Sequence, residues 1–299
     1  MVTQPAVTEQ TIATYRQAEN ANRRTSSRRG NVITLGPEEG SDVMITADLH
    51  GNRINFDRLM AIADLDGHPG RHLVMQEVCH GGPRYPCAEQ YSDPTGAPFG
   101  ACMSHLLLED IARLKAEFPT RFHFLLSNHE WAEMRDFPIT KSNKLLNLMF
   151  RSGLQEMYGE SAERVRTASV EFLISCPLAV RIAGGIFVCH SAPERIRDLG
   201  FDNDIWNRPL SEADFAPHGD VFRLLWGRDF TAENAAAFAS LVQAQVLVHG
   251  HEPCSAGFAV PNEFQLILDC CGQNGSYVVV PTHPCLTHSE IVDLVRQLG

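Results

Sequence analysis

The sequence predicts a layered α/β domain, and two observations lead to this prediction. After the first forty residues, short apolar segments of the β type alternate with segments of helical apolar spacing, as in sheets covered by helices. Polar residues of metal-ligand type follow several apolar segments directly, at the strand ends where open α/β sheets bind ligands. The 299 residues, 44% hydrophobic and 20% charged, have the ordinary composition of a globular protein with a buried core.

The expected elements follow a polar start. Residues 1–40 end in Gly-Pro-Glu-Glu-Gly, so we expect a lead-in helix and loop before a domain of residues 41–299. The expected strands are 42–46, 71–75, 122–126, 178–182, 185–189, 245–248, 264–268 and 277–280. The expected helices are 54–65, 101–118 and a helical stretch from 131 to about 175. Residues 77–100 are rich in Gly, Pro, Asp and Ser and predict a long loop insertion, which is usually functional or mobile.

Charge and cysteine content exclude several classes of protein. The net charge of -11 argues against extended nucleic-acid binding, which needs surplus Lys and Arg. Nine cysteines, with Cys270 next to Cys271, favour reduced thiols over a full set of disulfides. No apolar run approaches the roughly 18 residues that span a bilayer. We therefore expect a cytoplasmic protein that does not bind membranes.

Five polar residues lie just beyond the carboxyl ends of strand-like segments. They are Asp48, Glu77, Asn128, His190 and His251. A single histidine after a strand is usually structural, so the prediction depends on the whole set. Carboxylate oxygen, amide oxygen and imidazole nitrogen together suit Mn, Fe or Zn in an open site better than a closed structural zinc site.

Two segments carry a family resemblance. ADLHGN at residues 47–52 resembles the Gly-Asp-x-His-Gly motif of the calcineurin-like metallophosphoesterases, with Ala47 in place of the first glycine. FLLSNHE at residues 124–130 resembles their Gly-Asn-His-Glu motif, with Ser127 in place of the glycine. Four further segments extend the resemblance in chain order over residues 42–280.

Of these four segments, two resemble the parts of the family that carry later metal histidines. They are IFVCHSAPE at 186–194 and VLVHGHEP at 246–253. The other two, NRPLSEADF at 207–215 and LLWGRD at 224–229, look like the branch that contains the PPP-type Ser/Thr protein phosphatases. The combination is highly specific, although no single motif is.

The resemblance implies a fold and a metal centre. The fold would be a four-layer αββα sandwich of two mixed β-sheets flanked by helices, with the active site at the strand ends on one edge. Two divalent metal ions, Mn, Fe or Zn, would bind a hydroxide that attacks phosphorus in line. One metal would be held by Asp48 and His50, the other by Asn128, His190 and His251, with an acidic residue bridging both.

The resemblance also implies roles for two residues that are not metal ligands. His129 matches the histidine that faces the leaving-group oxygen, which makes it the expected general acid. Arg208 matches an arginine that clamps phosphate, and its planar fork suits two phosphate oxygens.

The family's second motif, Gly-Asp-x-x-Asp-Arg-Gly, is altered. Residues 76–82 read QEVCHGG, so Glu77 stands where the bridging aspartate belongs. Its carboxylate lies about 1.5 Å farther from the backbone, and the turn must retreat to compensate; Gln76 in place of the glycine fits a reshaped turn. Asp64 and Asp66 are poorer candidates for the bridge, because they leave too little chain after Asp48 for a helix and a strand.

Three further residues have open roles. His80 stands where an aspartate would orient His129, and an imidazole would not stabilise an imidazolium as a carboxylate does. His80 either donates a proton or a phosphate contact, or is a loop histidine without a role. Arg84 is a candidate to replace the missing second arginine, the alternative being a surface arginine. His249 either contacts substrate or supports the neighbouring ligand His251.

The sequence therefore predicts a metal-dependent hydrolase of phosphate esters, similar to the Ser/Thr protein phosphatases, that acts on a phosphoprotein or a small phosphate ester. One alternative is a nucleotide or dinucleoside polyphosphate hydrolase or a phosphodiesterase, because the loop at 77–100 would reshape the mouth of the cleft. An alternative of another class is a pseudoenzyme that binds metal or phosphate. The altered QEVCHGG segment is the observation that supports this alternative.

Overall fold

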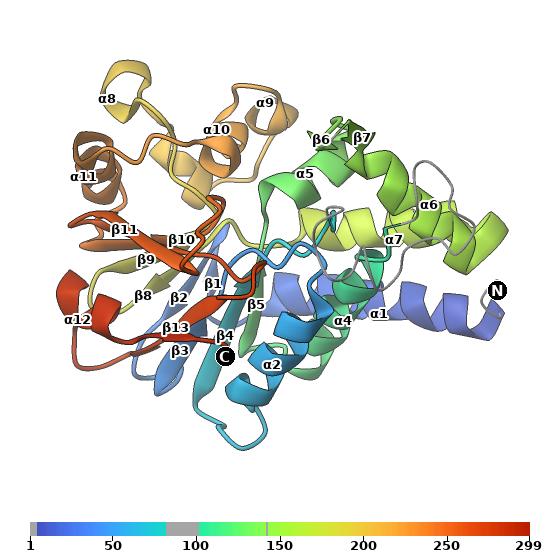
Figure 1. Cartoon of the computed structure of the whole chain (residues 1–299), viewed down its shortest axis with the longest axis horizontal. Helices are drawn as coiled ribbons and strands as arrows, with labels where there is room; N and C mark the ends of the chain where they lie inside the picture. Colours follow the sequence, from blue (N-terminus) through green and yellow to red (C-terminus); the bar gives the residue numbers. More distant parts are fainter. Residues whose placement is uncertain (1–4, 82–101, 142) are drawn as a thin grey trace.

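The computed structural model describes residues 5–81, 102–141 and 143–299 (Figure 1). Its architecture is mixed α/β, with two large mixed β-sheets flanked by helices. The predicted layered α/β class is therefore confirmed. No helix in the described ranges is long and apolar enough to cross a membrane.

The larger sheet has seven strands in the order β1-β2-β8-β9-β10-β12-β11. Its strands are β1 (Arg28–Arg29), β2 (Val32–Leu35), β8 (Ala179–Ile182), β9 (Ile186–Cys189), β10 (Val246–His249), β11 (Phe258–Asn262) and β12 (Gln265–Leu268). The central strands β9, β10 and β12 are parallel, so their carboxyl ends lie at one edge of the sheet.

The smaller sheet has five strands in the order β14-β13-β3-β4-β5. Its strands are β3 (Asp42–Ile45), β4 (Arg71–Gln76), β5 (Phe122–Leu125), β13 (Ser276–Pro281) and β14 (Val295–Gln297). Here β3, β4 and β5 are parallel. A separate two-stranded hairpin joins β6 (Thr140–Lys141) and β7 (Lys144–Leu145).

The two sheets share one apolar core. Val43 and Ile45 of β3 belong to the same buried cluster as Ile186 and Val188 of β9. The intervening Met44 points to the opposite side, into the cluster that the helices cover. Alternation of this kind follows from the two-residue period of a strand. Both faces of the central strands are therefore buried, which explains why these segments read as continuous apolar runs.

Helices cover the outer faces (Figure 1). They are α1 (Pro5–Arg24), α2 (Arg53–Ala63), α4 (His105–Glu117), α5 (Asn128–Arg135), α6 (Leu146–Tyr158), α7 (Ala162–Ile174), α8 (Ile196–Leu199), α9 (Glu212–Phe215), α10 (Asp220–Trp226), α11 (Ala232–Leu241) and α12 (His288–Asp293). The described residues also form two 3-10 turns, η1 (Gly159–Ser161) and η2 (Asn203–Trp206). The expected helical stretch from 131 to 175 is thus divided among α5, α6 and α7.

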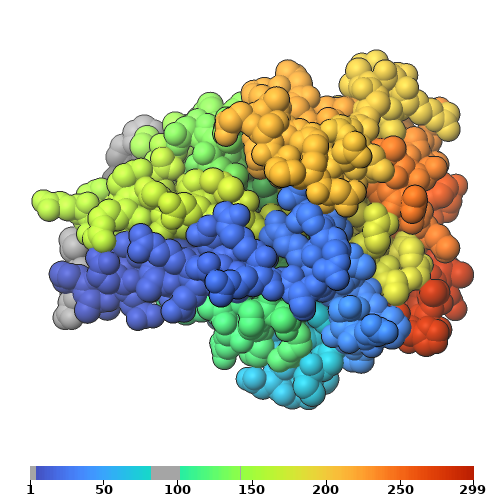
Figure 2. Space-filling view, turned by 180° about the vertical axis from the view of Figure 1, so that it is seen from behind, coloured from blue at the N-terminus to red at the C-terminus, as the bar shows by residue number. Residues whose placement is uncertain are grey.

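The N-terminal forty residues are more than the expected lead-in helix and loop. Helix α1 buries Ile12, Tyr15 and Ala18 in the main core, and it runs between α7 and α4 across the face shown in Figure 2. Strand β2 then pairs in parallel with β8. The sequence analysis missed this strand, because the short apolar run Val32–Leu35 lies within a polar segment. The domain boundary at residue 40 stays a prediction.

Helix α4 carries a buried carboxyl group where it meets α6. The Tyr158 hydroxyl donates a hydrogen bond of 2.6 Å to Glu109 Oε1, and Glu109 is only 4% exposed. Burial raises the pKa of Glu109 to about 7, because the ionised form loses its hydration.

We predict that Glu109→Gln stabilises the protein at alkaline pH. Wild-type Glu109 binds its proton more tightly in the folded chain, so the free energy of unfolding falls as pH rises from the unfolded pKa of 4.5 to about 7. Glutamine keeps the acceptor for Tyr158 without this loss. Urea unfolding should show a gain of about 2 to 3 kcal/mol over wild type at pH 8 relative to pH 4.5. Glu117→Gln, at an exposed position of α4, is the control, and an equal gain there would contradict the prediction.

Candidate metal centre

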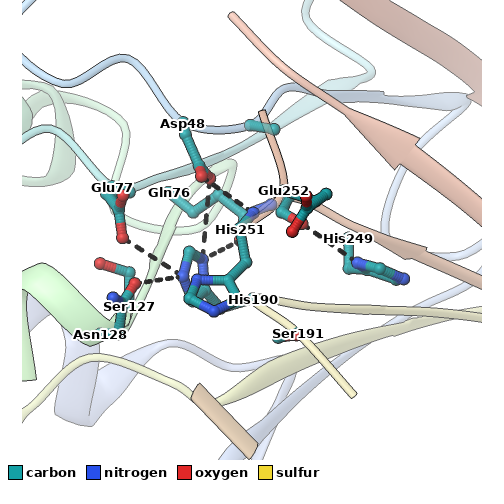
Figure 3. Close-up of polar contacts among 12 residues, drawn as sticks. Asp48, Gln76, Glu77, Ser127, Asn128, His190, Ser191, His249, His251 and Glu252 are labelled. Atoms are coloured by element: carbon teal, nitrogen blue, oxygen red, sulfur yellow. Dashed lines mark hydrogen bonds and ion pairs between the residues drawn. The ribbon is translucent and has the colours of Figure 1, made fainter. Parts of the chain in front are cut away.

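The strand ends of both sheets bring the predicted ligands together. The ligands are Asp48 after β3, Glu77 after β4, Asn128 at the start of α5 after β5, His190 after β9 and His251 after β10. His50 joins them from the turn that follows β3. Parallel strands end at a common edge, and Figure 3 shows Asp48, Glu77, Asn128, His190 and His251 converging on one small region.

Glu77 lies at the centre of this cluster. Its Oε1 is 2.8 Å from His50 Nε2, and its Oε2 is 3.2 Å from His190 Nε2. Asn128 Oδ1 approaches the same His190 nitrogen at 2.7 Å. The two carboxylate oxygens of Glu77 therefore face two different groups of ligand atoms, as a bridging residue requires.

Two sets of three ligand-type residues share Glu77. Within each set, all ligand atoms lie within 4.8 Å of one another: His50, Glu77 and His129 form one set, and Asp48, Glu77 and His190 form the other. The resemblance placed Asp48 with His50, whereas here its carboxylate lies on the His190 side. This position also lets Asp48 Oδ2 accept a hydrogen bond of 2.8 Å from the His251 backbone N–H.

Several buried polar atoms in the cluster lack the partners that burial normally requires. Asp48 Oδ1 and His251 Nε2 have no hydrogen-bond partner among the described residues, although buried polar atoms are nearly always paired. Gly250 leaves room for this carboxylate, because a Cβ there would lie 2.3 Å from Asp48 Oδ1. Oxygen and nitrogen atoms left open in this way fit the ligand set of a divalent transition metal.

The backbone around the cluster is held in conformations that side chains rarely adopt. The φ angles of His50, Glu77, His80 and His251 are 45°, 41°, 64° and 68°. Each such residue costs on the order of 1 kcal/mol or more. Glu77 thus lies in a left-handed turn after β4, and the reshaping of this turn by the longer side chain stays a prediction.

Glu130 fixes that turn from α5. Its Oε1 accepts hydrogen bonds from the backbone N–H groups of Val78 at 2.9 Å and Cys79 at 2.8 Å. The Ser127 hydroxyl donates to the other oxygen of Glu130. Ser127 thus has a function in place of the expected glycine, because it holds the carboxylate that anchors the Glu77 turn.

Outer hydrogen bonds set the orientation of two candidate ligands. His190 Nδ1 lies 3.0 Å from Gln76 Oε1, so the imidazole donates from Nδ1 and leaves the Nε2 lone pair towards Glu77 and Asn128. His50 Nδ1 lies 3.3 Å from the Cys79 carbonyl oxygen, which leaves His50 Nε2 towards Glu77 in the same way. Metal-binding histidines are generally oriented by an acceptor of this kind.

The electrostatics of the cluster favour an added cation. Burial, and next the Glu77 carboxylate, raise the pKa of Asp48. Burial opposes ionisation of Glu77 as well, yet the imidazoles of His129, His50 and His190 hold the pKa of Glu77 well below its usual value. Burial would also lower the pKa of His50, but Glu77 raises it to about 9. The buried carboxylates thus draw positive charge towards them, which a metal ion would supply.

The structure changes the interpretation of His80. Its side chain is buried, with Nδ1 at 3.0 Å from His129 Nδ1 and Nε2 at 2.7 Å from Glu133 Oε1. A proton or phosphate contact from His80 to a substrate is therefore not supported. The sequence analysis missed Glu133, and the signal that could have found it is its place one helical turn after His129 on α5.

Two of the remaining predicted site residues, Arg208 and His249, do not join the cluster. The Arg208 guanidinium is paired with Asp202 at 2.6 Å and with Asp214 at 2.6 Å, so a phosphate contact would require that ion pairs be released. His249 is fully buried, 2.9 Å from Gln265 Nε2 and stacked on Phe230. Figure 3 shows His249 apart from His190 and His251, which corrects its assignment as a substrate contact. Arg84 lies outside the described residues.

No protein-family model matches this sequence, and no curated protein matches it. Solved structures do match. A protein serine/threonine phosphatase from Saccharomyces cerevisiae with similarity to human phosphatase PP5 superposes with a TM-score of 0.66 at 13% identity, over 91% of this chain and 82% of that one. A cold-active protein-tyrosine phosphatase from Shewanella gives a TM-score of 0.54 at 13% identity, over 94% and 84% of the two chains.

The chain shares the fold of these phosphatases. This agrees with the resemblance that the sequence motifs carry. At 13% identity the likeness concerns the fold. The chemistry of this chain therefore depends on its own cluster of side chains at the strand ends.

We predict that Gln76→Leu weakens metal binding about 10- to 100-fold, because His190 Nδ1 loses the acceptor that orients it. Calorimetric titration of metal-stripped protein with Mn²⁺ measures this. Gln265→Leu is the matched control, since Gln265 is also fully buried and contacts a histidine, His249, outside the cluster. Unchanged affinity in Gln76→Leu, or an equal loss in both variants, would contradict the orienting role.

Proposed function

We propose that this chain is a metal-dependent phosphatase that hydrolyses phosphate monoesters such as phosphoserine and phosphothreonine. The observation that carries the proposal is the position of Glu77, whose two oxygens face the His50 side and the His190 side of one buried cluster. The fold shared with two protein phosphatases supports phosphoester hydrolysis. We also propose that the sheets and helices form the four-layer αββα arrangement of the metallophosphoesterases, and that the protein is cytoplasmic.

The proposal requires two divalent ions, Mn, Fe or Zn, with Glu77 between them. Their ligands would be His50 on one side, Asn128, His190 and His251 on the other, and Asp48 beside the latter group. Ions held there would supply positive charge that neutralises a phosphoryl group and lowers the pKa of a water molecule.

The residues of the chain perform the remaining tasks. His129 lies against His50 with a ring-centroid distance of 4.6 Å, so its imidazole faces the cluster from α5. It is the proposed general acid that protonates the leaving oxygen. The buried ligands leave little room for bulk water, which strengthens electrostatic interactions with a phosphoryl group.

A hollow beside the cluster can take the organic part of a substrate. It has a volume of about 570 Å³ and is lined in part by Leu199, Phe222 and Trp226. The Trp226 ring lies 6.4 Å from the His251 ring, centroid to centroid. The Arg228 guanidinium, which is paired with Glu252, is close enough to lower the pKa of His251, after burial and His190. An apolar wall next to a proposed metal ligand suits a phosphate ester with an aromatic or peptide leaving group.

We predict that the purified protein hydrolyses an aryl phosphate with Mn²⁺ and that Asp48→Asn lowers kcat at least about 10²-fold. Asparagine keeps the shape and the acceptor for the His251 N–H but removes the charge that faces the cluster. Glu109→Gln, which also removes a buried carboxylate but lies in α4, should keep kcat within about threefold.

The outcomes separate the alternatives. If the wild-type protein binds metal but hydrolyses no phosphate ester, the phosphatase proposal is wrong and the chain is a pseudoenzyme. Equal rates for wild type and Asp48→Asn would show that the turnover comes from another site. Faster turnover of nucleotides, dinucleoside polyphosphates or diesters than of phosphoserine peptides would keep the hydrolase and change its substrate.

A further inference from the structure

The buried Glu133 carboxylate is linked to the proposed general acid, His129, through one intervening side chain, His80. His129 Nδ1 lies 3.0 Å from His80 Nδ1, and His80 Nε2 lies 2.7 Å from Glu133 Oε1. His80 and Glu133 are 1% and 2% exposed. The three side chains form an unbroken line from the cluster into the core.

The hydrogen-bonding capacity of these groups fixes the protons. A carboxylate oxygen is a hydrogen-bond acceptor, so we assign His80 Nε2 as the donor to Glu133. An imidazole that donates through one nitrogen accepts through the other, so we assign His80 Nδ1 as the acceptor of the proton on His129 Nδ1. His129 therefore keeps a proton on Nδ1, and its Nε2 remains the nitrogen that can exchange a proton with a substrate.

We propose that Glu133 is a positioning residue for the general acid, acting on His129 through His80. This inference rests on the proposed phosphatase function. During turnover a water molecule forms the new bond to phosphorus and releases a proton to solvent, as the P–O bond to the leaving group breaks and its electron pair stays on the leaving oxygen. That oxygen takes the Nε2 proton of His129, which begins the step with both ring nitrogens protonated. His129 ends neutral, with its Nδ1 proton still donated to His80, so no proton passes along His80 or Glu133.

Both positioning residues are themselves held in place. Asn147 Nδ2 donates to Glu133 Oε1 at 2.8 Å. The His80 backbone N–H donates to Ser104 Oγ at 3.0 Å, and its ring packs edge-on against Phe150 at a centroid distance of 5.6 Å. Fixed partners of this kind lock a catalytic side chain into one orientation. The chain thus still has a carboxylate that acts on His129, but this carboxylate comes from α5 and not from position 80 of the altered second motif.

A structural role for Glu133 gives a different expectation from a positioning role. Loss of a structural contact would lower the turnover of all substrates together. Loss of an oriented general acid lowers kcat for a substrate whose leaving group needs a proton, as an alkoxide does. It leaves kcat nearly unchanged for a substrate whose leaving group departs as a stable anion. The ratio of kcat values on a phosphoserine peptide and on 2,4-dinitrophenyl phosphate distinguishes the two roles.

The experiment uses Glu133→Leu, which removes the acceptor while keeping a similar volume. We expect kcat to fall about 10²-fold on the phosphoserine peptide and to stay within about threefold on 2,4-dinitrophenyl phosphate. Nitrogen NMR of the histidine rings should show one tautomer for His129 in wild type and a mixture in the variant. Glu109→Gln is the control, since it removes a buried carboxylate that lies in α4 outside this line of residues, and it should keep the wild-type ratio of kcat values.

A second substitution tests for rescue. His80→Asp places a carboxylate oxygen about where His80 Nδ1 now lies, because both atoms are bonded to Cγ. In the Glu133→Leu background it should restore kcat on the peptide to within about tenfold of wild type. Equal losses on both substrates in Glu133→Leu, or no rescue, would overturn the positioning role and leave the phosphatase function standing. If wild type hydrolyses neither substrate, the proposed function fails as well.

Discussion

The site depends on one carboxylate group placed between two sets of imidazoles. Glu77 reaches His50 with one oxygen and His190 with the other, which brings the turn after β4 into contact with histidines that follow strands of both sheets. Burial of an anion is costly unless positive charge compensates it, and the surrounding imidazoles hold its pKa well below the usual value. His50 and His190 contact this carboxylate directly, and Asn128 contacts the same nitrogen of His190.

The turn that carries Glu77 is held by hydrogen bonds to side chains of the next strand end. Its left-handed backbone is kept by the Glu130 carboxylate, which accepts two backbone N–H groups, and Ser127 holds Glu130 in turn. Gln76, just before Glu77, orients His190. The departures from the family motif at positions 76, 77, 80 and 127 are therefore linked, since each side chain contacts the cluster or a residue that supports it.

Sequence patterns were sufficient for the features that depend on local periodicity. An apolar run followed by Asp48, Glu77 or His190 identified both the strand and the edge at which its ligand lies. The spacing on α5 places Glu133 one turn after His129, but its contact with His80 depends on the packing of the 78–80 turn on α5, which local periodicity does not show. The pairing of Arg208 with Asp202 and Asp214 depends on a loop conformation, and β2 depends on pairing with β8. Motif matching assigned Arg208 to substrate without these contacts.

Anomalous X-ray diffraction from crystals grown with Mn²⁺ tests the bridging position of Glu77 most directly. We predict two anomalous peaks about 3.5 to 4 Å apart, one beside His50 and one beside His190 and Asn128, with the Glu77 carboxylate between them. A single peak, or two peaks that do not share Glu77, would contradict the central claim that this glutamate bridges a pair of metal ions.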